Sequence, residues 1–291
     1  MFKGILTAQI TPFKDGKIDI ETFERLVERQ KQASIDGIVI GGCTGESFTL
    51  ELEECQSLWK SAKKFQSETF KVIFGVAHNS TARTLEMISV ANKYDPDGLL
   101  VITPFANKPS QTGLVKYFTK VAEVSTSPII LYNVPGRTAV SLNAETILKL
   151  SENPKIVALK EALSEFDEFT RLRNIINSNN FSLLSGEDSL TFPALCIGWN
   201  GVICTSSNLI PDLWAKMYRA FLEKDLKTAS SIHLSMFSLI KSLFVEGNPA
   251  PLKYAMKLMK LYNGELREPL VEVSDSSKSL LEKELKNLNL I

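Results

Sequence analysis

The sequence contains little cysteine and little histidine. It has four cysteines and two histidines in 291 residues, and no two cysteines stand in a Cys-x-x-Cys spacing. The usual zinc-finger spacings are therefore excluded, and a disulfide framework is not expected. Apolar residues make up 44% of the chain, which is enough to build a core without such cross-links. We expect a single-core protein of a reducing compartment, the cytoplasm.

The sequence also lacks net charge and long apolar runs. Its 33 Lys and Arg balance 33 Asp and Glu, whereas proteins that bind nucleic acid or anionic membrane present basic surfaces. No apolar run approaches the roughly 18 residues that span a membrane. The first residues, MFKGILTAQITPF, lack the apolar stretch and cleavage site of a signal peptide. We expect neither nucleic acid nor a membrane as a partner.

Short apolar runs recur along the chain, and no linker-like segment separates them. Most are continuously apolar rather than alternating, which is typical of parallel strands buried on both faces. We predict strands at Ile5–Ile10, Gly37–Gly41, Lys71–Val76, Gly98–Ile102, Pro128–Tyr132, Ile156–Lys160, Phe181–Ser185 and Gly201–Thr205.

Amphipathic segments lie between these runs and predict helices. One helix is expected to begin after Asp19, whose side chain can cap it, and a second covers Thr81–Lys93. A third carries Ile147 and is capped by either Ser141 or Asn143.

Eight such β/α repeats favour a closed (β/α)8 barrel, an α/β TIM barrel. An open doubly wound sheet would also have a glycine-rich phosphate loop near its first strand, and this sequence has none. After about Pro211 the pattern is helical to the end of the sequence. We predict the barrel over residues 1–223 and a C-terminal helical extension over residues 224–291.

Barrel enzymes work at the C-terminal ends of their strands, and Lys160 is the most informative residue there. It follows the apolar run Ile156–Leu159, so its ammonium is expected inside the barrel mouth. Desolvation lowers the pKa of a lysine and makes its amine available for a Schiff base with a carbonyl substrate. Alternatively, Lys160 is a structural lysine paired with Glu161 or another carboxylate.

Other strand ends carry further candidates. Tyr132 either presents its phenol to Lys160 as a proton donor and acceptor, or is a core tyrosine. Arg137 either binds a carboxylate through two hydrogen bonds, or is a solvated surface residue. The loop Gly41–Ser47 offers hydroxyls and backbone N–H groups to a small anion. Cys43 in that loop is a nucleophile or, because no histidine can be assigned to it, a small apolar residue.

Together, the motifs at these strand ends resemble those of the dihydrodipicolinate synthases, within the N-acetylneuraminate lyase superfamily of class I pyruvate aldolases. The resemblance covers nearly the whole chain, from Thr11-Pro12-Phe13 to Gly247-Asn248-Pro249-Ala250-Pro251-Leu252-Lys253. The motifs are Gly42-x-Thr44-Gly45-Glu46-Ser47, Tyr132-Asn133-Val134-Pro135-Gly136-Arg137-Thr138, Leu159-Lys160-Glu161-Ala162 and Leu184-Ser185-Gly186-Glu187-Asp188.

The resemblance implies a role for each candidate residue. Lys160 forms the Schiff base with pyruvate, and Tyr132 transfers protons. Thr44, with help from the backbone, holds the pyruvate carboxylate. Arg137 binds the carboxylate of the second substrate, aspartate semialdehyde, and favours the synthase branch over the neuraminate lyases.

The resemblance also implies that Gly186 and the carbonyl of Ile203 line the substrate pocket. No metal or organic cofactor is expected, because the protonated imine on the lysine is itself the electron sink. Family members are commonly homotetramers built from two tight dimers, so we expect a homo-oligomer, either dimer or tetramer.

Two positions depart from the family pattern. Cys43 stands where the family usually has a threonine that links two tyrosines into a proton relay, and Ala106 stands where the second tyrosine usually falls. A thiol hydrogen-bonds weakly and an alanine side chain not at all, so slower proton transfer is expected. The family's lysine-binding pocket is also changed, which predicts insensitivity to lysine. Its positions correspond to Phe48, Leu52, Cys55, Arg83 and Phe105, with Asn79 retained.

These observations leave three functions open. The first is condensation of pyruvate with L-aspartate 4-semialdehyde to 4-hydroxy-tetrahydrodipicolinate, in lysine and diaminopimelate biosynthesis. The second, motivated by Cys43 and Ala106, is a related pyruvate aldolase acting on a 2-keto-3-deoxy sugar acid or an N-acetylneuraminate-like substrate. The third is a non-catalytic barrel relative, against which the retained Lys160, Tyr132 and Arg137 argue.

Overall fold

The structure is a computed structural model that describes residues 1–76 and 78–291. Its parallel strands pair in the closed order β1-β10-β9-β8-β7-β6-β5-β4, which confirms the predicted barrel. The strands are β1 Gly4–Ala8, β4 Gly37–Ile40, β5 Lys71–Gly75, β6 Gly98–Ile102, β7 Ile129–Asn133, β8 Ile156–Glu161, β9 Ser182–Ser185 and β10 Gly201–Cys204. All eight predicted runs form strands, with ends displaced by at most two residues.

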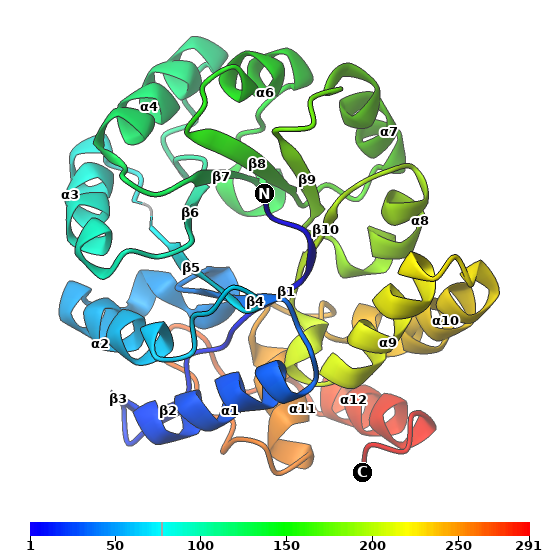
Figure 1. The fold of residues 1–291 in the computed structure, drawn as a ribbon. Coiled ribbons are helices and arrows are strands. Elements are labelled where there is room, and N and C mark those ends of the chain that lie inside the picture. The colour runs from blue at the N-terminus through cyan, green and yellow to red at the C-terminus, as the bar shows by residue number, and fades with distance from the viewer. Residues whose placement is uncertain (77) are drawn as a thin grey trace. The chain divides into compact units, whose positions relative to one another are not determined.

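By compactness the chain divides into two units, and the first contains Met1–Gly4 with Lys71–Ile203. Within it, helices lie outside the strands β6 to β9 (Figure 1). They are α3 Thr81–Ala91 with the short η3 Asn92–Tyr94, α4 Gln111–Val124, α5 Pro135–Thr138, α6 Ala144–Ser151, α7 Phe166–Ile175, η4 Asp188–Leu190 and α8 Thr191–Cys196. Neighbouring helices pack on one another in chain order, α3 on α4, α4 on α6 and α6 on α7.

The second unit contains Ile5–Phe70 with Cys204–Ile291. Its first part includes α1 Ile20–Gln32, η1 Cys43–Gly45, η2 Ser47–Thr49 and α2 Leu52–Lys63. Its second part contains η5 Ser206–Asn208, α9 Pro211–Leu222, α10 Leu226–Ser242, α11 Ala250–Leu258 and α12 Asp275–Asn287. The helices predicted after Pro211 are thus confirmed, and α10 packs on both α9 and α12.

Two predicted helix starts can be compared with the structure. Asp19 caps α1, where its side chain accepts a hydrogen bond from the N–H of Thr22. Of the two alternatives for α6, Asn143 is the cap, because its side chain accepts from the N–H of Thr146. Ser141 instead lies against the side chain of Asn133.

A short hairpin was not predicted from the sequence. Strands β2 (Phe13–Lys14) and β3 (Lys17–Ile18) pair antiparallel around Asp15 and Gly16. Both turn residues have positive φ, 53° and 75°, which is the geometry that favours Asp-Gly in tight hairpins. Two-residue strands show no periodicity, so the Asp-Gly pair was the only available signal.

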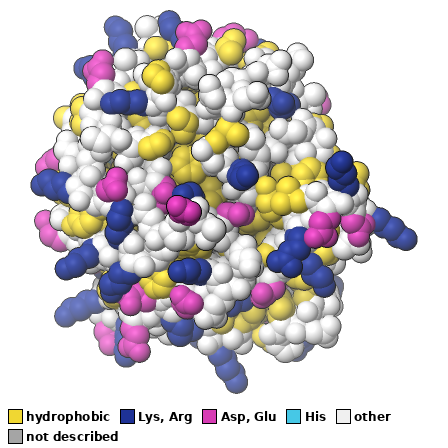
Figure 2. Space-filling view, viewed as in Figure 1, with side chains coloured by type: hydrophobic (Ala, Val, Ile, Leu, Met, Phe, Trp, Pro, Cys, Tyr) yellow, Lys and Arg dark blue, Asp and Glu magenta, His cyan; other side chains and the backbone are white. Residues whose placement is uncertain are grey.

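Charges of both signs mix on the surface. Figure 2 shows Lys and Arg side chains interspersed with Asp and Glu side chains over one face of the molecule. The balanced composition is therefore not divided into two oppositely charged regions on that face. Among residues 1–76 and 78–291, none of the helices combines the length and apolar character that crossing a membrane requires.

Candidate active site

The two residues expected to carry the chemistry lie side by side in the first unit. Tyr132 on β7 and Lys160 on β8 are partners in the parallel register, so their side chains project from neighbouring strands to the same side. Lys160 is 6% exposed and Tyr132 is 7% exposed. The Lys160 Nζ lies 4.2 Å from the centroid of the Tyr132 ring. The sequence therefore predicted correctly that these two side chains meet.

Glu161 does not share this position, although it follows Lys160 directly. Successive residues of a strand point to opposite faces, and the Glu161 carboxylate accepts hydrogen bonds from Asn133 Nδ2 at 2.8 Å and from the N–H of Leu163 at 3.1 Å. Burial raises the pKa of Glu161 to about 8, and the hydrogen bonds from Asn133 and the backbone partly oppose that rise. The partner of this carboxylate is an amide, so the alternative that pairs it with Lys160 does not fit the geometry.

Gly186 leaves room for the Lys160 side chain. A Cβ at this position would lie 3.0 Å from the Lys160 Cε and 2.9 Å from both the Ala162 Cβ and the Glu161 carbonyl oxygen. Real Cβ atoms do not approach this closely without something moving. Ile203 lies on β10, one residue after Val202. Val202 is the register partner of Ser185, the last residue of β9, and Gly186 follows directly. The end of β10 therefore lies beside the end of β9. The glycine therefore has a packing function next to the lysine.

Arg137 lies in a tight turn that follows β7. The turn contains the short helix α5 and ends at Ala139, whose φ of 58° is left-handed. Arg137 is exposed, whereas its neighbour Thr138 is buried and donates a hydrogen bond to the Val140 carbonyl at 2.9 Å. The Thr103 hydroxyl in turn donates to the Thr138 hydroxyl at 3.2 Å. The backbone of the turn is thus held, while the Arg137 side chain is exposed.

Thr44 and Cys43 lie in the second unit, in η1. Cys43 is half-buried and Thr44 is buried. Asn248 Nδ2 donates a hydrogen bond to Thr44 Oγ1 at 3.0 Å, and Thr205 Oγ1 lies 3.3 Å from the same atom. The Thr44 hydroxyl either donates its hydrogen to Thr205 or accepts one from Thr205, in which case its own hydrogen can reach another acceptor. The sequence did not identify Asn248 as a partner, although it lies within the motif that ends at Lys253.

The backbone of this loop is less available to an anion than expected. The N–H groups of Gly45 and Ser47 donate to the Gly42 carbonyl, at 3.0 and 3.4 Å, and the N–H of Glu46 donates to the Cys43 carbonyl at 3.1 Å. Those three donors are therefore used inside the loop. An anion at this place would have to use the Thr44 hydroxyl and the N–H groups that precede Gly45.

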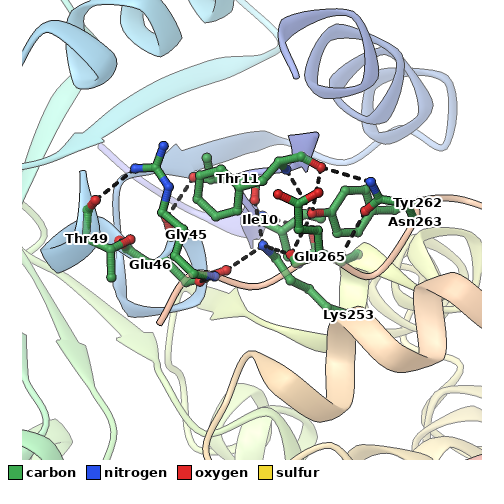
Figure 3. A network of polar contacts seen from close by, with 12 residues as sticks. Ile10, Thr11, Gly45, Glu46, Thr49, Lys253, Tyr262, Asn263 and Glu265 are labelled. Atoms are coloured by element: carbon green, nitrogen blue, oxygen red, sulfur yellow. Dashed lines mark hydrogen bonds and ion pairs between the residues drawn. The ribbon is translucent and has the colours of Figure 1, made fainter. Parts of the chain in front are cut away.

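A buried ion pair anchors the end of the same loop (Figure 3). The Lys253 ammonium pairs with the Glu46 carboxylate, and both side chains are almost completely inaccessible to solvent. Lys253 Nζ also donates to the carbonyl oxygens of Thr11 at 2.8 Å and Glu265 at 2.9 Å, and it lies 4.3 Å from the centroid of the Phe13 ring. Burial lowers the pKa of Lys253 to about 8, and the charge and hydrogen bond of Glu46 oppose that fall.

Arg267 completes this network from the C-terminal part of the chain. Its N–H donates to Glu46 Oε2 at 3.0 Å, and its guanidinium donates to the Thr49 carbonyl at 2.8 Å and to both oxygens of Glu54. The segment Glu46–Thr49 is thus held by residues more than 200 positions later in the chain. The sequence contains one indication of this network: the charged residue Lys253 lies within the otherwise mostly apolar run Ala250–Met256.

Metal ligands do not gather in the part of the chain that the structure describes. Within it, no three His, Cys, Asp or Glu side chains converge as they would around a metal ion. The chemistry that the described geometry does offer is a buried amine beside a phenol, with an exposed arginine on the turn that follows the phenol's strand.

Comparison with known proteins decides which family this geometry belongs to. The model of the dihydrodipicolinate synthetase family matches residues 1–288. The chain belongs to this family. The match to the dihydrodipicolinate synthetase family confirms the resemblance noted in the sequence, and with it the prediction of a pyruvate-dependent synthase.

Individual relatives agree with this assignment. The 4-hydroxy-tetrahydrodipicolinate synthase of Thermosipho africanus is 40% identical over 293 residues, covering 100% of both chains. The solved structure of dihydrodipicolinate synthase from Thermotoga maritima is 36% identical, with a TM-score of 0.97 over 100% of both chains. A solved monomeric variant of dihydrodipicolinate synthase is also 36% identical, with a TM-score of 0.97 over 100% of this chain and 98% of that one.

Proposed function

We propose that this chain condenses pyruvate with L-aspartate 4-semialdehyde to form 4-hydroxy-tetrahydrodipicolinate, with Lys160 as the Schiff-base residue. The observation that carries the proposal is the buried Lys160 amine over the Tyr132 ring in a member of the dihydrodipicolinate synthetase family. Burial favours the neutral form of an amine, and the neutral form is the one that attacks a carbonyl.

The reaction proceeds through an imine on Lys160. The amine attacks C2 of pyruvate, and loss of water gives the imine, which accepts electrons when a C3 proton leaves to form an enamine. The enamine carbon then attacks the aldehyde of the second substrate. The amino group of that substrate attacks the imine carbon, closes the ring and releases Lys160. One water is lost overall, so no oxidant or reductant is needed.

Other side chains share the remaining steps. Tyr132 donates and accepts the protons that these steps move, and Arg137 binds the carboxylate of the aldehyde substrate. Thr44 binds the pyruvate carboxylate through its hydroxyl hydrogen. Gly186 and the Ile203 carbonyl line the pocket around the imine.

Cys43 and Ala106 set the rate of proton transfer in this proposal. Cys43 takes the relay position next to Thr44, and Ala106 supplies no polar group. A weakened proton relay lowers the rate by a factor on the order of 10² to 10⁴. These two residues also motivate a second candidate, an aldolase that uses the same Schiff base on a 2-keto-3-deoxy sugar acid or an N-acetylneuraminate-like substrate.

Borohydride trapping tests the Schiff base. With pyruvate and sodium borohydride, mass spectrometry is expected to find a reduced pyruvyl adduct on the peptide that contains Lys160, and none in Lys160→Ala. The matched control is Lys257→Ala, which removes an exposed lysine paired with Glu272 and is expected to retain the adduct on Lys160. A missing adduct, or one that persists in Lys160→Ala, contradicts the proposal.

Substrate choice is tested separately by turnover. The purified protein is assayed with pyruvate and aspartate semialdehyde, and in the cleavage direction with sugar-derived keto acids. The highest kcat/KM is expected for aspartate semialdehyde. A higher value for a keto-deoxy sugar acid would instead assign the second candidate.

We also propose that the protein acts in the cytoplasm, without a metal or organic cofactor, as a homodimer or homotetramer. The imine supplies the electron sink that a metal or cofactor would otherwise provide, so EDTA is expected to leave the rate unchanged. Sedimentation of the purified protein decides the oligomeric state, and a monomer is the outcome that would contradict this proposal.

A further inference from the structure

The Asn133 side chain forms a buried bridge between β8 and the chain that returns after the Arg137 turn. Asn133 and Glu161 are register partners at the ends of β7 and β8, and both side chains are 0% exposed. Asn133 Nδ2 donates to Glu161 Oε2 at 2.8 Å and to Ser141 Oγ at 3.2 Å. Asn133 Oδ1 accepts from the N–H of Leu142 at 2.9 Å. One amide therefore joins the end of the Lys160 strand to the far end of the turn.

Besides this bridge, the turn between Asn133 and Leu142 has short internal bonds and two contacts with the segment after β6. The Thr103 hydroxyl donates to the Thr138 hydroxyl at 3.2 Å, and Gln111 Nε2 donates to the Ser141 carbonyl at 2.8 Å. The N–H groups of Arg137 and Thr138 donate to the Val134 carbonyl at 2.9 and 3.1 Å, and the N–H of Ala139 donates to the Pro135 carbonyl at 2.8 Å. These bonds shape the turn but do not orient it relative to β8. A left-handed alanine such as Ala139 is retained only where surrounding contacts over-determine it. The Asn133 bridge supplies that constraint at the base of the turn.

The polarity of the bridge is unambiguous when Glu161 is ionised, the form that prevails above its pKa of about 8. The Glu161 carboxylate already accepts the N–H of Leu163 and requires a donor at its other oxygen, while the N–H of Leu142 requires an acceptor. An asparagine amide meets both demands in one orientation only. Glu161→Gln would set its NH2 group against either the Asn133 NH2 group or the Leu163 N–H, and Asn133→Asp would set two carboxyl groups against each other. Each single change leaves buried polar atoms without partners.

We propose that Asn133 and Glu161 are a positioning pair that holds the Arg137 turn at the end of β8 and thereby sets the affinity for the aldehyde substrate. This inference rests on the proposed role of Arg137 as the carboxylate-binding residue. The pair acts through the turn and not on Lys160, whose side chain projects to the other face of β8. Loss of the pair is therefore expected to weaken binding of the aldehyde substrate and to leave binding of pyruvate unchanged.

The test exchanges the polarity of the pair and is made above about pH 8, where Glu161 is ionised. Asn133→Asp and Glu161→Gln are each expected to raise the KM for aspartate semialdehyde by about tenfold or more, the equivalent of one lost buried hydrogen bond. The KM for pyruvate and the borohydride adduct on Lys160 are expected to stay unchanged. In the double variant, the carboxylate introduced at position 133 accepts from the amide introduced at position 161 and from the N–H of Leu142. The KM for the aldehyde should then return to within about threefold of wild type.

The outcomes separate failure of this inference from failure of the function on which it rests. Arg137→Gln is measured alongside: if it leaves the KM for the aldehyde unchanged, Arg137 does not bind the substrate and the inference falls with it. If Arg137→Gln raises that KM but Asn133→Asp and Glu161→Gln do not, the positioning role of the pair is refuted, while the proposed role of Arg137 stands. Equal losses for both substrates, or a double variant as impaired as the singles combined, also refute it.

A milder variant keeps the test valid if a single variant fails to fold. Ser141→Ala removes one bond to the Asn133 amide from a half-buried position. It is expected to raise the KM for the aldehyde by about threefold, with the KM for pyruvate unchanged. No change in either value would overturn the inference.

Discussion

The Lys160 Nζ lies over the face of the Tyr132 ring, 4.2 Å from its centroid. Because the two residues are register partners on adjacent parallel strands, the backbone pairing of β7 with β8 sets this contact. The ring therefore fixes the position of the Lys160 Nζ, while the phenol hydroxyl lies at the ring's edge. Tyr132 thus combines two functions that substitution can separate.

Tyr132→Phe tests that separation. The ring remains under Lys160, so the pyruvate adduct should still form at saturating pyruvate. Loss of the hydroxyl is expected to lower kcat for condensation by a factor on the order of 10² to 10⁴. Trapping with borohydride measures the first property and steady-state turnover measures the second. An unchanged kcat would show that another group moves the proton.

Gly186→Ala should slow Schiff-base formation although it leaves the Lys160 side chain itself unchanged. The added methyl group would lie 3.0 Å from the Lys160 Cε and force that side chain to shift. A displacement of this size at a reacting group costs up to about 10²-fold in rate, so we expect much slower adduct formation in rapid-quench trapping. Gly247→Ala is the control, since a Cβ there meets nothing within 4 Å. Equal rates in both variants would contradict the packing role of Gly186.

The pair of Lys253 and Glu46 should show the energetics of a buried ion pair. Lys253→Met leaves the Glu46 carboxylate buried and uncompensated, which costs about 3 to 5 kcal/mol of unfolding free energy. Adding Glu46→Gln removes that charge, so the double variant should be more stable than Lys253→Met alone. Urea unfolding measures both values.

An exposed pair provides the matched control for this experiment. Lys257 and Glu272 also form an ion pair, but their side chains are 51% and 50% exposed. Lys257→Met should therefore cost less than about 1 kcal/mol. If it destabilised the protein as much as Lys253→Met, burial would not be the cause of the difference.

Glu161 should make stability depend on pH. Burial raises its pKa from 4.5 to about 8, so between these values the folded protein keeps a proton that the unfolded chain releases. The unfolding free energy contributed by this group therefore falls as pH rises from about 4.5 to about 8, by about 1.4 kcal/mol for each unit of pKa shift.

Glu161→Gln removes that titration. The stability of wild type relative to Glu161→Gln should be greatest near about pH 5 and should decline steadily toward about pH 8. Chemical denaturation over this range measures the difference. A difference that stays constant with pH would show that Glu161 has the same pKa in the folded and unfolded protein.

Lysine should not inhibit the enzyme. The positions that correspond to the family's lysine pocket include Arg83, which is exposed on α3, and its positive charge opposes that of a lysine ligand. Cys55, at another of these positions, is buried. Initial rates are expected to be the same with and without millimolar lysine, and a saturable decrease would contradict this.

The sequence was sufficient to predict the strands and the proximity of Lys160 and Tyr132. Runs such as Gly98–Ile102 are apolar throughout, because both faces of a barrel strand are covered, and that pattern is local. Lys160 and Tyr132 each end such a run. Because the C-terminal ends of barrel strands meet at one end of the barrel, their proximity was predictable from the sequence. The hairpin β2–β3 was missed because strands of two residues have no periodicity to detect.

The partners of polar residues were decided only by the tertiary structure. Nothing local distinguishes Glu161 as a partner of Asn133 from Glu161 as a partner of Lys160; the alternation of side chains along β8 makes that choice. Likewise Glu46 meets Lys253 and Arg267 across more than 200 residues of sequence. Apolar burial follows from a residue's own side chain and its spacing. A buried hydrogen bond or ion pair needs two groups within about 3 Å in the right orientation, and only the folded chain determines which two those are.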